Sequence, residues 1–349
     1  MYKKYNLKCD LNNRGGDKYT LSIGYFCPHN IGDMIVSLDM LYAIKHIYHA
    51  KVIVFCRKNT ENILKNFDFI DNIELIDKID KNIIPQINKY PIDYLISFHA
   101  KSFLIKLLIN TNTKYIIVKA KFVSIFSLKC KTIFTSITKR FFKNRSDRDR
   151  MLYYARKINS SIFDIKIKNL EFKTQIQTNA IHKILINDFL RKNEIKNFVI
   201  LNPFSITSKH TLDIISFLKL AKNIKKNYQN ISIVIPTYEL VHDDFIDEIH
   251  KYDKNLLEEI IVFKNNSDIL NLAELISRSK CIISPSTGAI HIATNLKIPS
   301  IALYPPKDEI FWPTYNKDYI IITKTQNNLR EDEKQEFIEN ITKRLKKYL

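Results

Sequence analysis

Hydroxyl, glycine and histidine side chains gather in the segment 283–306, which reads ISPSTGAIHIATNLKIPSIALYPP. Ser286, Thr287 and Gly288 form a turn between an expected strand and an expected helix, and His291 lies one turn into that helix. Ser and Thr are favoured at helix N-termini, where unpaired N–H groups and the helix dipole attract anions. The pattern therefore predicts an anion site at which Gly288 lets a ligand phosphate approach the backbone.

Two further loops carry residues that suit proton transfer or phosphate binding. The loop 27–34 (CPHNIGDM) holds Gly32, which frees the backbone, and Asp33, whose carboxylate either caps the following helix or accepts a proton from a substrate hydroxyl. The loop 201–211 (LNPFSITSKHT) offers hydroxyl groups and a cation, which suit phosphate oxygens. These candidates are Ser205, Thr207, Ser208 and Lys209.

The elements that position these loops alternate between strand and helix. Apolar runs predict strands at 19–26, 51–56, 72–76, 90–99, 197–205, 231–236, 259–263, 281–284 and 300–305, and most of them are separated by amphipathic helices. The segment 119–160 is expected to be mostly helix or loop. Such alternation predicts parallel strands with crossover helices, and so an α/β protein with two doubly wound domains, 1–175 and 176–349. Ligands of such domains bind beyond the carboxyl ends of the strands, where the three loops lie.

Several classes of protein are excluded by what the sequence lacks. Its five glycines cannot be arranged as G-x-G-x-x-G or as a Walker loop, which argues against a dinucleotide dehydrogenase or a P-loop ATPase. The five cysteines show no C-x-x-C, and neither H-E-x-x-H nor a carboxylate cluster is present, so no metal is expected. The first 20 residues lack the apolar core of a signal peptide, and the cytoplasm is the expected location.

The chain is strongly basic, with a formal net charge of +19. Between Lys119 and Arg150 there are ten Lys or Arg and two acidic residues, interleaved with phenylalanines. Such a segment can contact nucleic acid, an anionic membrane surface or an anionic substrate, and it can also be a solvated helical face. We expect a membrane contact that includes Lys139, Arg140, Lys143, Arg145, Arg148 and Arg150, with Phe141 and Phe142 entering the interface.

The three loops together resemble glycosyltransferase family 9, the lipopolysaccharide heptosyltransferases. IGDMIVSLDMLYAIK is similar to the first-helix signature of that family, and LNPFSITSK is similar to its N-P-G-x-x-x-x-K loop. SPSTGAIHIATNLKIPSIALYPP resembles its D-[ST]-G-x-x-H-x-A…P-x-x-x-L-[FY]-G-P segment, and FWPTY resembles its W-x-P. The motifs occur in the family's order along nearly the whole chain.

The resemblance implies two Rossmann-like domains that face a cleft, an acceptor-side domain at 1–175 and a nucleotide-sugar-binding domain at 176–349. It implies metal-independent, inverting transfer of a sugar from a nucleotide diphosphate sugar, typically ADP-heptose, to the lipopolysaccharide or lipooligosaccharide core. Asp33 matches the proposed base and Lys209 the phosphate-facing lysine. Thr287, Gly288 and His291 match the donor loop. Asp243 is the nearest candidate for an acidic residue that contacts the nucleotide.

The sequence departs from the family pattern at three positions. Ser286 stands where the family usually has Asp, Phe204 where it has Gly, and Asp39 where it has Pro. The first two lie on the donor side, which leaves a hexose or hexosamine donor open. The resulting expectation is a glycosyltransferase, peripheral on the inner face of a bacterial cytoplasmic membrane, that acts on an anionic glycolipid. The alternatives are a nucleotide-sugar epimerase of the same architecture, a basic nucleic-acid-binding protein, and an inactive sugar-nucleotide binder.

Overall fold

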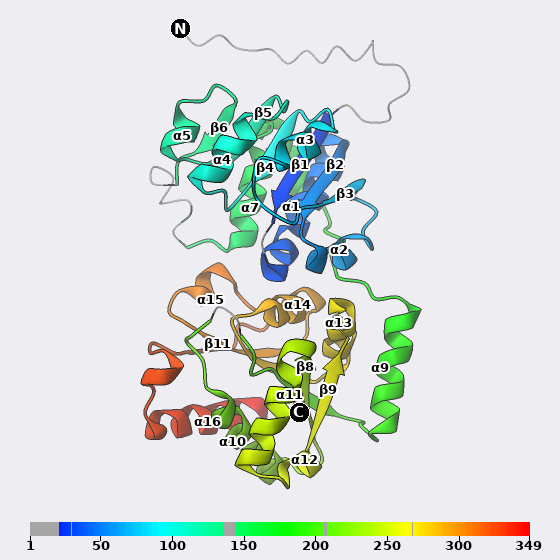
Figure 1. Cartoon of the computed structure of the whole chain (residues 1–349), viewed down its shortest axis with the longest axis vertical. Coiled ribbons are helices and arrows are strands. Elements are labelled where there is room, and N and C mark those ends of the chain that lie inside the picture. The colour runs from blue at the N-terminus through cyan, green and yellow to red at the C-terminus, as the bar shows by residue number, and fades with distance from the viewer. Residues whose placement is uncertain (1–20, 29, 136–141, 143, 206–207, 267) are drawn as a thin grey trace.

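The computed structural model describes residues 21–349 except 29, 136–141, 143, 206–207 and 267. Two parallel six-stranded sheets, each flanked by helices, lie one above the other along the long axis (Figure 1). The prediction of an α/β protein with two doubly wound sheets is confirmed. The chain passes between the sheets through 170–179, which holds neither helix nor strand. The predicted boundary after residue 175 lies in that segment and stays a prediction.

The first sheet has the strand order β3-β2-β1-β4-β5-β6. In register, Ile23 of β1 lies beside Val52 of β2 and Tyr94 of β4. Its strands are β1 (Leu21–Cys27), β2 (Ala50–Cys56), β3 (Asn72–Leu75), β4 (Tyr94–Ser97), β5 (Tyr115–Lys119) and β6 (Cys130–Ile133). The helices are α1 (Ile31–Tyr48), α2 (Lys58–Leu64), α3 (Ile83–Asn88), α4 (Ser102–Ile109), α5 (Phe122–Ile125), α7 (Asp147–Arg156) and α8 (Ser160–Lys166), followed by the 3-10 turn η1 (Ile167–Asn169).

The second sheet has the order β12-β11-β10-β7-β8-β9, which is the same winding as in the first. Its strands are β7 (Phe198–Leu201), β8 (Ser232–Tyr238), β9 (Ile260–Asn265), β10 (Cys281–Pro285), β11 (Ser300–Tyr304) and β12 (Tyr319–Ile321). The helices are α9 (Ala180–Lys192), α10 (Ile214–Asn227), α11 (Glu239–Tyr252), α12 (Leu256–Glu259), α13 (Ile269–Arg278), α14 (Gly288–Leu296), α15 (Asp308–Phe311) and α16 (Glu331–Leu345), with the 3-10 turn η2 (Gln326–Asn328) before α16.

The described part of 119–160 is mostly helix or loop, as expected, but it also contains β6, which pairs with β5 at the edge of the first sheet. Neither β5, β6 nor β12 was expected from the sequence. β5 buries only its three central residues between two exposed ends, and β12 has three residues. Strands this short give no alternating pattern long enough to recognise.

The two halves pack against each other through α1 and α2 of the first and α13 and α14 of the second (Figure 1). α1 is apolar on most of its surface, and its buried residues join a hydrophobic core that also contains Ala289 and Ile290 of α14. A helix that is apolar nearly all round is stable only when it is covered on every side. The shared core therefore fixes the N-terminal ends of α1 and α14 close together.

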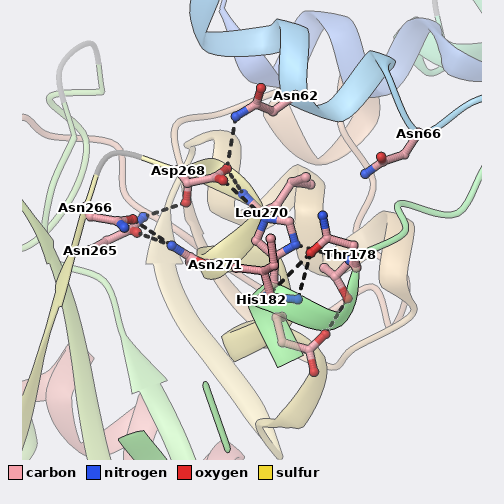
Figure 2. Close-up of polar contacts among 12 residues, drawn as sticks. Asn62, Asn66, Thr178, His182, Asn265, Asn266, Asp268, Leu270 and Asn271 are labelled. Carbon is pink, nitrogen blue, oxygen red and sulfur yellow. Dashed lines mark hydrogen bonds and ion pairs between the residues drawn. The ribbon is translucent and has the colours of Figure 1, made fainter. Parts of the chain in front are cut away.

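A polar cluster connects the halves beside the linker, as Figure 2 shows. Asp268 accepts hydrogen bonds from Asn62 of α2 (3.3 Å) and from the backbone N–H of Leu270 (3.0 Å), and it contacts His182 Nε2 of α9 at 3.2 Å. Asn66 donates to the carbonyl of Gln177 in the linker (2.8 Å). Burial acts to raise the pKa of Asp268, but these hydrogen bonds outweigh it and lower the pKa. The charged carboxylate therefore joins α2, α9 and α13.

None of the described helices is both long enough and apolar enough to cross a membrane.

Candidate active site

A cavity of about 510 Å³ lies between the two halves, beyond the carboxyl ends of β1, β7, β10 and β11. Residues of all three loops that the sequence singled out contribute to its wall. The lining residues are Asn30, Gly32, Asp33, Ser208, Lys209, His210, Ser286, Thr287, Gly288, His291, Pro305, Asp308, Trp312 and Thr325. Since parallel strands end at a common edge, loops far apart in sequence meet there.

One contact between the two halves at this cavity joins Gly32 of α1 to His291 of α14. A Cβ at position 32 would lie 2.5 Å from Cδ2 and 2.9 Å from Nε2 of His291. Gly32 is therefore required by the packed imidazole, and not, as the sequence suggested, by the freedom of its own backbone. At Gly288 a Cβ would lie 3.4 Å from Ile31, an ordinary contact, so packing alone does not require that glycine.

Asp33 lies in the first turn of α1, where the helix dipole favours a negative charge. The N-cap position of α1 belongs to Asn30, so Asp33 is not the capping residue. Its half-buried carboxylate lies 3.3 Å from Nε2 of His99, which follows β4. Sequence reasoning missed His99, although the histidine directly follows a buried strand, as the chosen loops do. A carboxylate and an imidazole in contact at a cavity can share a proton.

His291 and Trp312 line the cavity on the side of the second half, and their rings meet edge to face with centroids 5.9 Å apart. Burial lowers the pKa of His291 to about 4, while the Asp33 carboxylate acts in the opposite direction. The imidazole is therefore neutral at pH 7. Trp312 Nε1 donates to Asp147 of α7 at 3.0 Å, which ties the loop after β11 to the first half.

Asp147 is a buried carboxylate behind this wall. Burial raises its pKa, and the charges of Arg150 and His99 together with the Trp312 hydrogen bond oppose that rise. Arg150 contacts Asp147 at 3.2 Å, donates to the carbonyl of Phe142 and lies 4.3 Å from the ring of Phe311. The sequence gave no signal for Asp147, and it marked Trp312 only through the resemblance of FWPTY to the family's W-x-P, without assigning it to the site. Tertiary packing brings these two residues together.

The loop after β7 contributes Ser208 and Lys209 to the cavity wall. Ser205 does not line the cavity. Its hydroxyl accepts a hydrogen bond from the backbone N–H of Ser208 at 2.8 Å, which holds the loop. Thr207 lies outside the described residues. The carbonyl of Lys209 accepts a hydrogen bond from Gln326 at 2.8 Å, which fixes its backbone against the start of η2.

The loop after β10 holds a serine–carboxylate pair. Ser286 Oγ donates to Asp308 Oδ2 at 2.9 Å, and both residues line the cavity. Burial raises the pKa of Asp308, and the Ser286 hydrogen bond opposes the rise. Where the family usually carries a carboxylate at position 286, this chain has Ser286, and Asp308 of α15 places a carboxylate next to that serine. Asp308 was missed by sequence reasoning, although it follows the strand predicted at 300–305.

Thr287 stands at the N-cap position of α14 but makes no side-chain cap. Its hydroxyl instead contacts Ser284 Oγ at 3.0 Å and Asn202 Nδ2 at 3.4 Å. Those contacts hold the loop from beneath, and they leave the first N–H groups of α14 uncapped by the Thr287 side chain.

Asp243, Arg145 and Arg148 do not line this cavity. Asp243 is an exposed residue of α11, 3.9 Å from Lys264, and does not line the cavity. Arg148 is exposed, but it pairs with Asp39 and its guanidinium lies 5.1 Å from the ring centroid of Phe172. Arg145 is exposed, and Lys139, Arg140 and Lys143, with Phe141, lie outside the described residues. Phe142 is buried, so the expectation that it enters a membrane is wrong.

The family model described as glycosyltransferase family 9 (heptosyltransferase) matches residues 252–342. The predicted resemblance to this family is confirmed. The matched segment contains β10, α14, β11 and α15, which build the Ser286–Asp308 side of the cavity. No curated protein matches the sequence.

Solved structures of glycosyltransferases share the fold. Heptosyltransferase II of E. coli, which acts on ADP-heptose and lipopolysaccharide by its description, has a TM-score of 0.69 at 13% identity and covers 94% of this chain and 99% of its own. A family 9 glycosyltransferase of Veillonella parvula has a TM-score of 0.68 at 14% identity, and the match covers 93% of this chain and 90% of its own. E. coli heptosyltransferase WaaC with ADP has a TM-score of 0.60 at 14% identity, and the match covers 93% of this chain and 98% of its own. The fold is therefore the GT-B arrangement of two Rossmann-like sheets.

Within the described residues, no group of three His, Cys, Asp or Glu side chains is placed to hold a metal ion.

Proposed function

We propose that this protein is an inverting glycosyltransferase that moves a sugar, a heptose or a related one, from a nucleotide diphosphate sugar to the core of lipopolysaccharide or lipooligosaccharide. The observation that carries the proposal is the placement of Asp33 in one half opposite Lys209 and the N-terminus of α14 in the other, around one cavity. We assign the acceptor to residues 1–175 and the donor to 176–349.

In this proposal Asp33 takes the proton from the acceptor hydroxyl as its oxygen attacks the anomeric carbon from the face opposite the diphosphate. The new C–O bond forms while the bond to the diphosphate oxygen breaks, which inverts the anomeric centre. A positioned base contributes roughly 10²–10⁴ in rate. His99, whose Nε2 lies 3.3 Å from Asp33 Oδ1, holds the carboxylate in position.

Lys209 and the first N–H groups of α14 receive the charge that develops on the leaving diphosphate. Preorganised donors of this kind are worth about 3–4 kcal/mol at the transition state. No metal is required in this mechanism, because a lysine and a helix N-terminus supply the positive potential. The neutral His291 forms the wall behind the reacting atoms without competing for the proton.

The donor we propose first is ADP-heptose, because solved neighbours of the same fold are described with ADP and with ADP-2-deoxy-2-fluoro heptose. The Ser286–Asp308 pair faces the cavity next to the donor loop, and its carboxylate accepts hydrogen bonds from sugar hydroxyls. The acceptor is an anionic glycolipid, which places the enzyme as a peripheral protein on the inner face of the cytoplasmic membrane.

A thermal-shift panel of ADP-, UDP-, GDP- and CMP-sugars tests the donor. A bound donor stabilises the folded state by mass action, by about 2.7 kcal/mol at a hundredfold excess over Kd. Turnover of the selected donor is then measured with and without a core oligosaccharide acceptor. Transfer that requires the acceptor supports the proposal. Release of the nucleoside diphosphate and free sugar without any acceptor would favour an epimerase.

A further inference from the structure

Large apolar side chains are exposed on one short segment of the first half. Phe122 and Phe126 of α5 and its C-terminal end are 78% and 75% exposed, Ile125 is exposed, and Leu128 is fully exposed. Together these four residues are called the α5 surface. The four residues fall within seven consecutive positions of the chain, and two of them, Phe122 and Phe126, are in contact. Monomeric proteins rarely expose contiguous large apolar patches without an interaction that uses them.

The α5 surface is preassembled and faces outward. The rings of Phe122 and Phe126 contact each other edge to face, with centroids 4.9 Å apart. Ser124 is the buried residue of α5, and its hydroxyl donates to the carbonyl of Lys121 at 2.9 Å. α5 packs against α4, on which Phe103 is also exposed. Ser124 of this helix therefore points inward and Val123 packs against the core, whereas the larger side chains of Phe122 and Ile125 point to solvent, which is unusual for a surface helix.

Lysines surround the α5 surface without acidic residues among them. Lys101, Lys106, Lys119 and Lys121 are exposed, and none of the four forms an ion pair within the described residues. From residue 94 to residue 146 the sequence contains no Asp or Glu. α4, α5 and β6 lie together at the β6 end of the first sheet (Figure 1). An apolar centre with a cationic border is complementary to an anionic leaflet, whose surface attracts each nearby lysine.

We infer that the α5 surface docks the protein on a membrane leaflet that carries anionic head groups. The inference rests on the proposed function in one respect, namely that the acceptor is anchored in that leaflet. It moves the membrane contact from the predicted segment 139–150 to the exposed residues of 101–128. Of the earlier segment, Phe142 is buried, Arg150 is half-buried against Phe311, and Arg148 is exposed but paired with Asp39.

Two other occupants fit the surface less well. Nucleic acid binds to lysines and stacks on aromatic rings, but it forms no comparable contact with the exposed aliphatic side chains of Ile125 and Leu128. A second copy of the chain would bring two lysine borders face to face, which like-charge repulsion opposes. A membrane leaflet offers hydrocarbon to the exposed apolar side chains and anionic head groups to the lysines.

The test is sedimentation of the full chain with vesicles of phosphatidylcholine, with and without phosphatidylglycerol. Wild-type protein is expected to sediment with the anionic vesicles. Phe122→Ser with Phe126→Ser should weaken the binding at least about tenfold, since burial of one Phe alone is worth more than that factor. Lys119→Glu with Lys121→Glu should weaken it on anionic vesicles, and added salt should reduce the wild-type binding in the same way.

Matched controls come from the second half. Leu240→Ser removes an exposed apolar side chain of α11 that is 85% exposed, and Lys254→Glu with Lys280→Glu reverses two exposed charges. Neither control should change vesicle binding. Equal sedimentation of wild type and the Phe122→Ser, Phe126→Ser variant would overturn the inference. So would a wild type that binds RNA or self-associates through these residues but ignores both kinds of vesicle.

Transfer to a lipid-free core oligosaccharide separates this inference from the proposed function. The α5-surface variants should keep the wild-type rate with that acceptor and lose rate only with acceptor presented in vesicles. Vesicle binding by a wild type that turns over no nucleotide sugar would leave the docking surface standing and reject the proposed function. Loss of rate by the variants with both acceptors, with normal vesicle binding, would reject the docking surface.

Discussion

Replacing Gly32 with alanine tests whether the contact between α1 and α14 sets the shape of the cavity. The added Cβ would lie 2.5 Å from Cδ2 of His291, whereas non-bonded carbon atoms are most stable at about 3.5–4.0 Å. The imidazole must therefore move by about 1 Å, or the halves must separate by a similar distance. His291 is packed against Trp312, so neither movement is free of cost.

The expected loss of stability is the difference between two opposing effects. Overpacking costs about 1–3 kcal/mol, and alanine gains about 0.5–1 kcal/mol over glycine inside a helix. The free energy of unfolding should therefore fall by up to about 2.5 kcal/mol, which corresponds to a fall of up to roughly 3 °C in Tm for a chain of 349 residues. A displacement of about 1 Å at reacting groups can reduce turnover by about a hundredfold. Turnover should therefore fall more than stability does.

Thermal melting and steady-state kinetics measure both effects, with Gly288→Ala as the matched control for packing. A Cβ there would meet Ile31 at 3.4 Å, an ordinary contact, so its Tm should be unchanged or slightly higher. Adding His291→Ala to Gly32→Ala should recover part of the lost Tm, because the clashing ring is gone. The reasoning is refuted if Gly32→Ala melts like Gly288→Ala, or if the Gly32→Ala and His291→Ala effects on Tm simply add.

Two further substitutions probe the carboxylates of the cavity. Asp33→Asn should reduce turnover by at least about a hundredfold while melting and nucleotide affinity stay unchanged, and a normal rate would leave Asp33 with only a favourable interaction with the α1 dipole. Asp308 has a raised pKa, so the stability that it contributes is complete below the ordinary carboxyl pKa and is lost as pH rises through the raised value. Asp308→Asn should therefore flatten the fall in Tm between the ordinary carboxyl pKa and the raised pKa, and the variant should melt slightly higher than wild type at neutral pH. It should also weaken donor binding. An unchanged pH profile of Tm would contradict this reasoning.

The sequence was sufficient to predict which loops meet. Lys209 and Gly288 follow strands of the second sheet, which end at a common edge, and Asp33 follows a strand of the first sheet. Ligands of two doubly wound domains bind in the crevice between the carboxyl ends of their strands. The same rule, applied to every strand, would have found His99 after β4 and Asp308 after β11. It could not have found Trp312 and Asp147, whose hydrogen bond joins parts of the chain 165 residues apart.

Other details depend on packing that short segments do not encode. Phe126 and Phe142 both stand in basic, aromatic surroundings, yet one is exposed and the other is buried. A helix as short as α5 has too few residues for an apolar periodicity to tell its two faces apart. Asp243 was sought directly after the strand that ends in Ile-Pro, but β8 continues to Tyr238 and α11 begins at Glu239, which carries Asp243 onto an exposed helix.

The most direct test of the proposed donor site is a calorimetric titration of wild type and Lys209→Ala with the selected nucleoside diphosphate and with its nucleoside. If the cavity holds the diphosphate between Lys209 and the N-terminus of α14, the variant should bind the nucleoside diphosphate at least about tenfold more weakly, since a hydrogen bond to a charged group is worth about 1.5–3 kcal/mol. The affinity for the nucleoside should stay the same. Equal losses for both ligands, or no binding of either by the wild type, would contradict the assignment of this cavity to a nucleotide sugar.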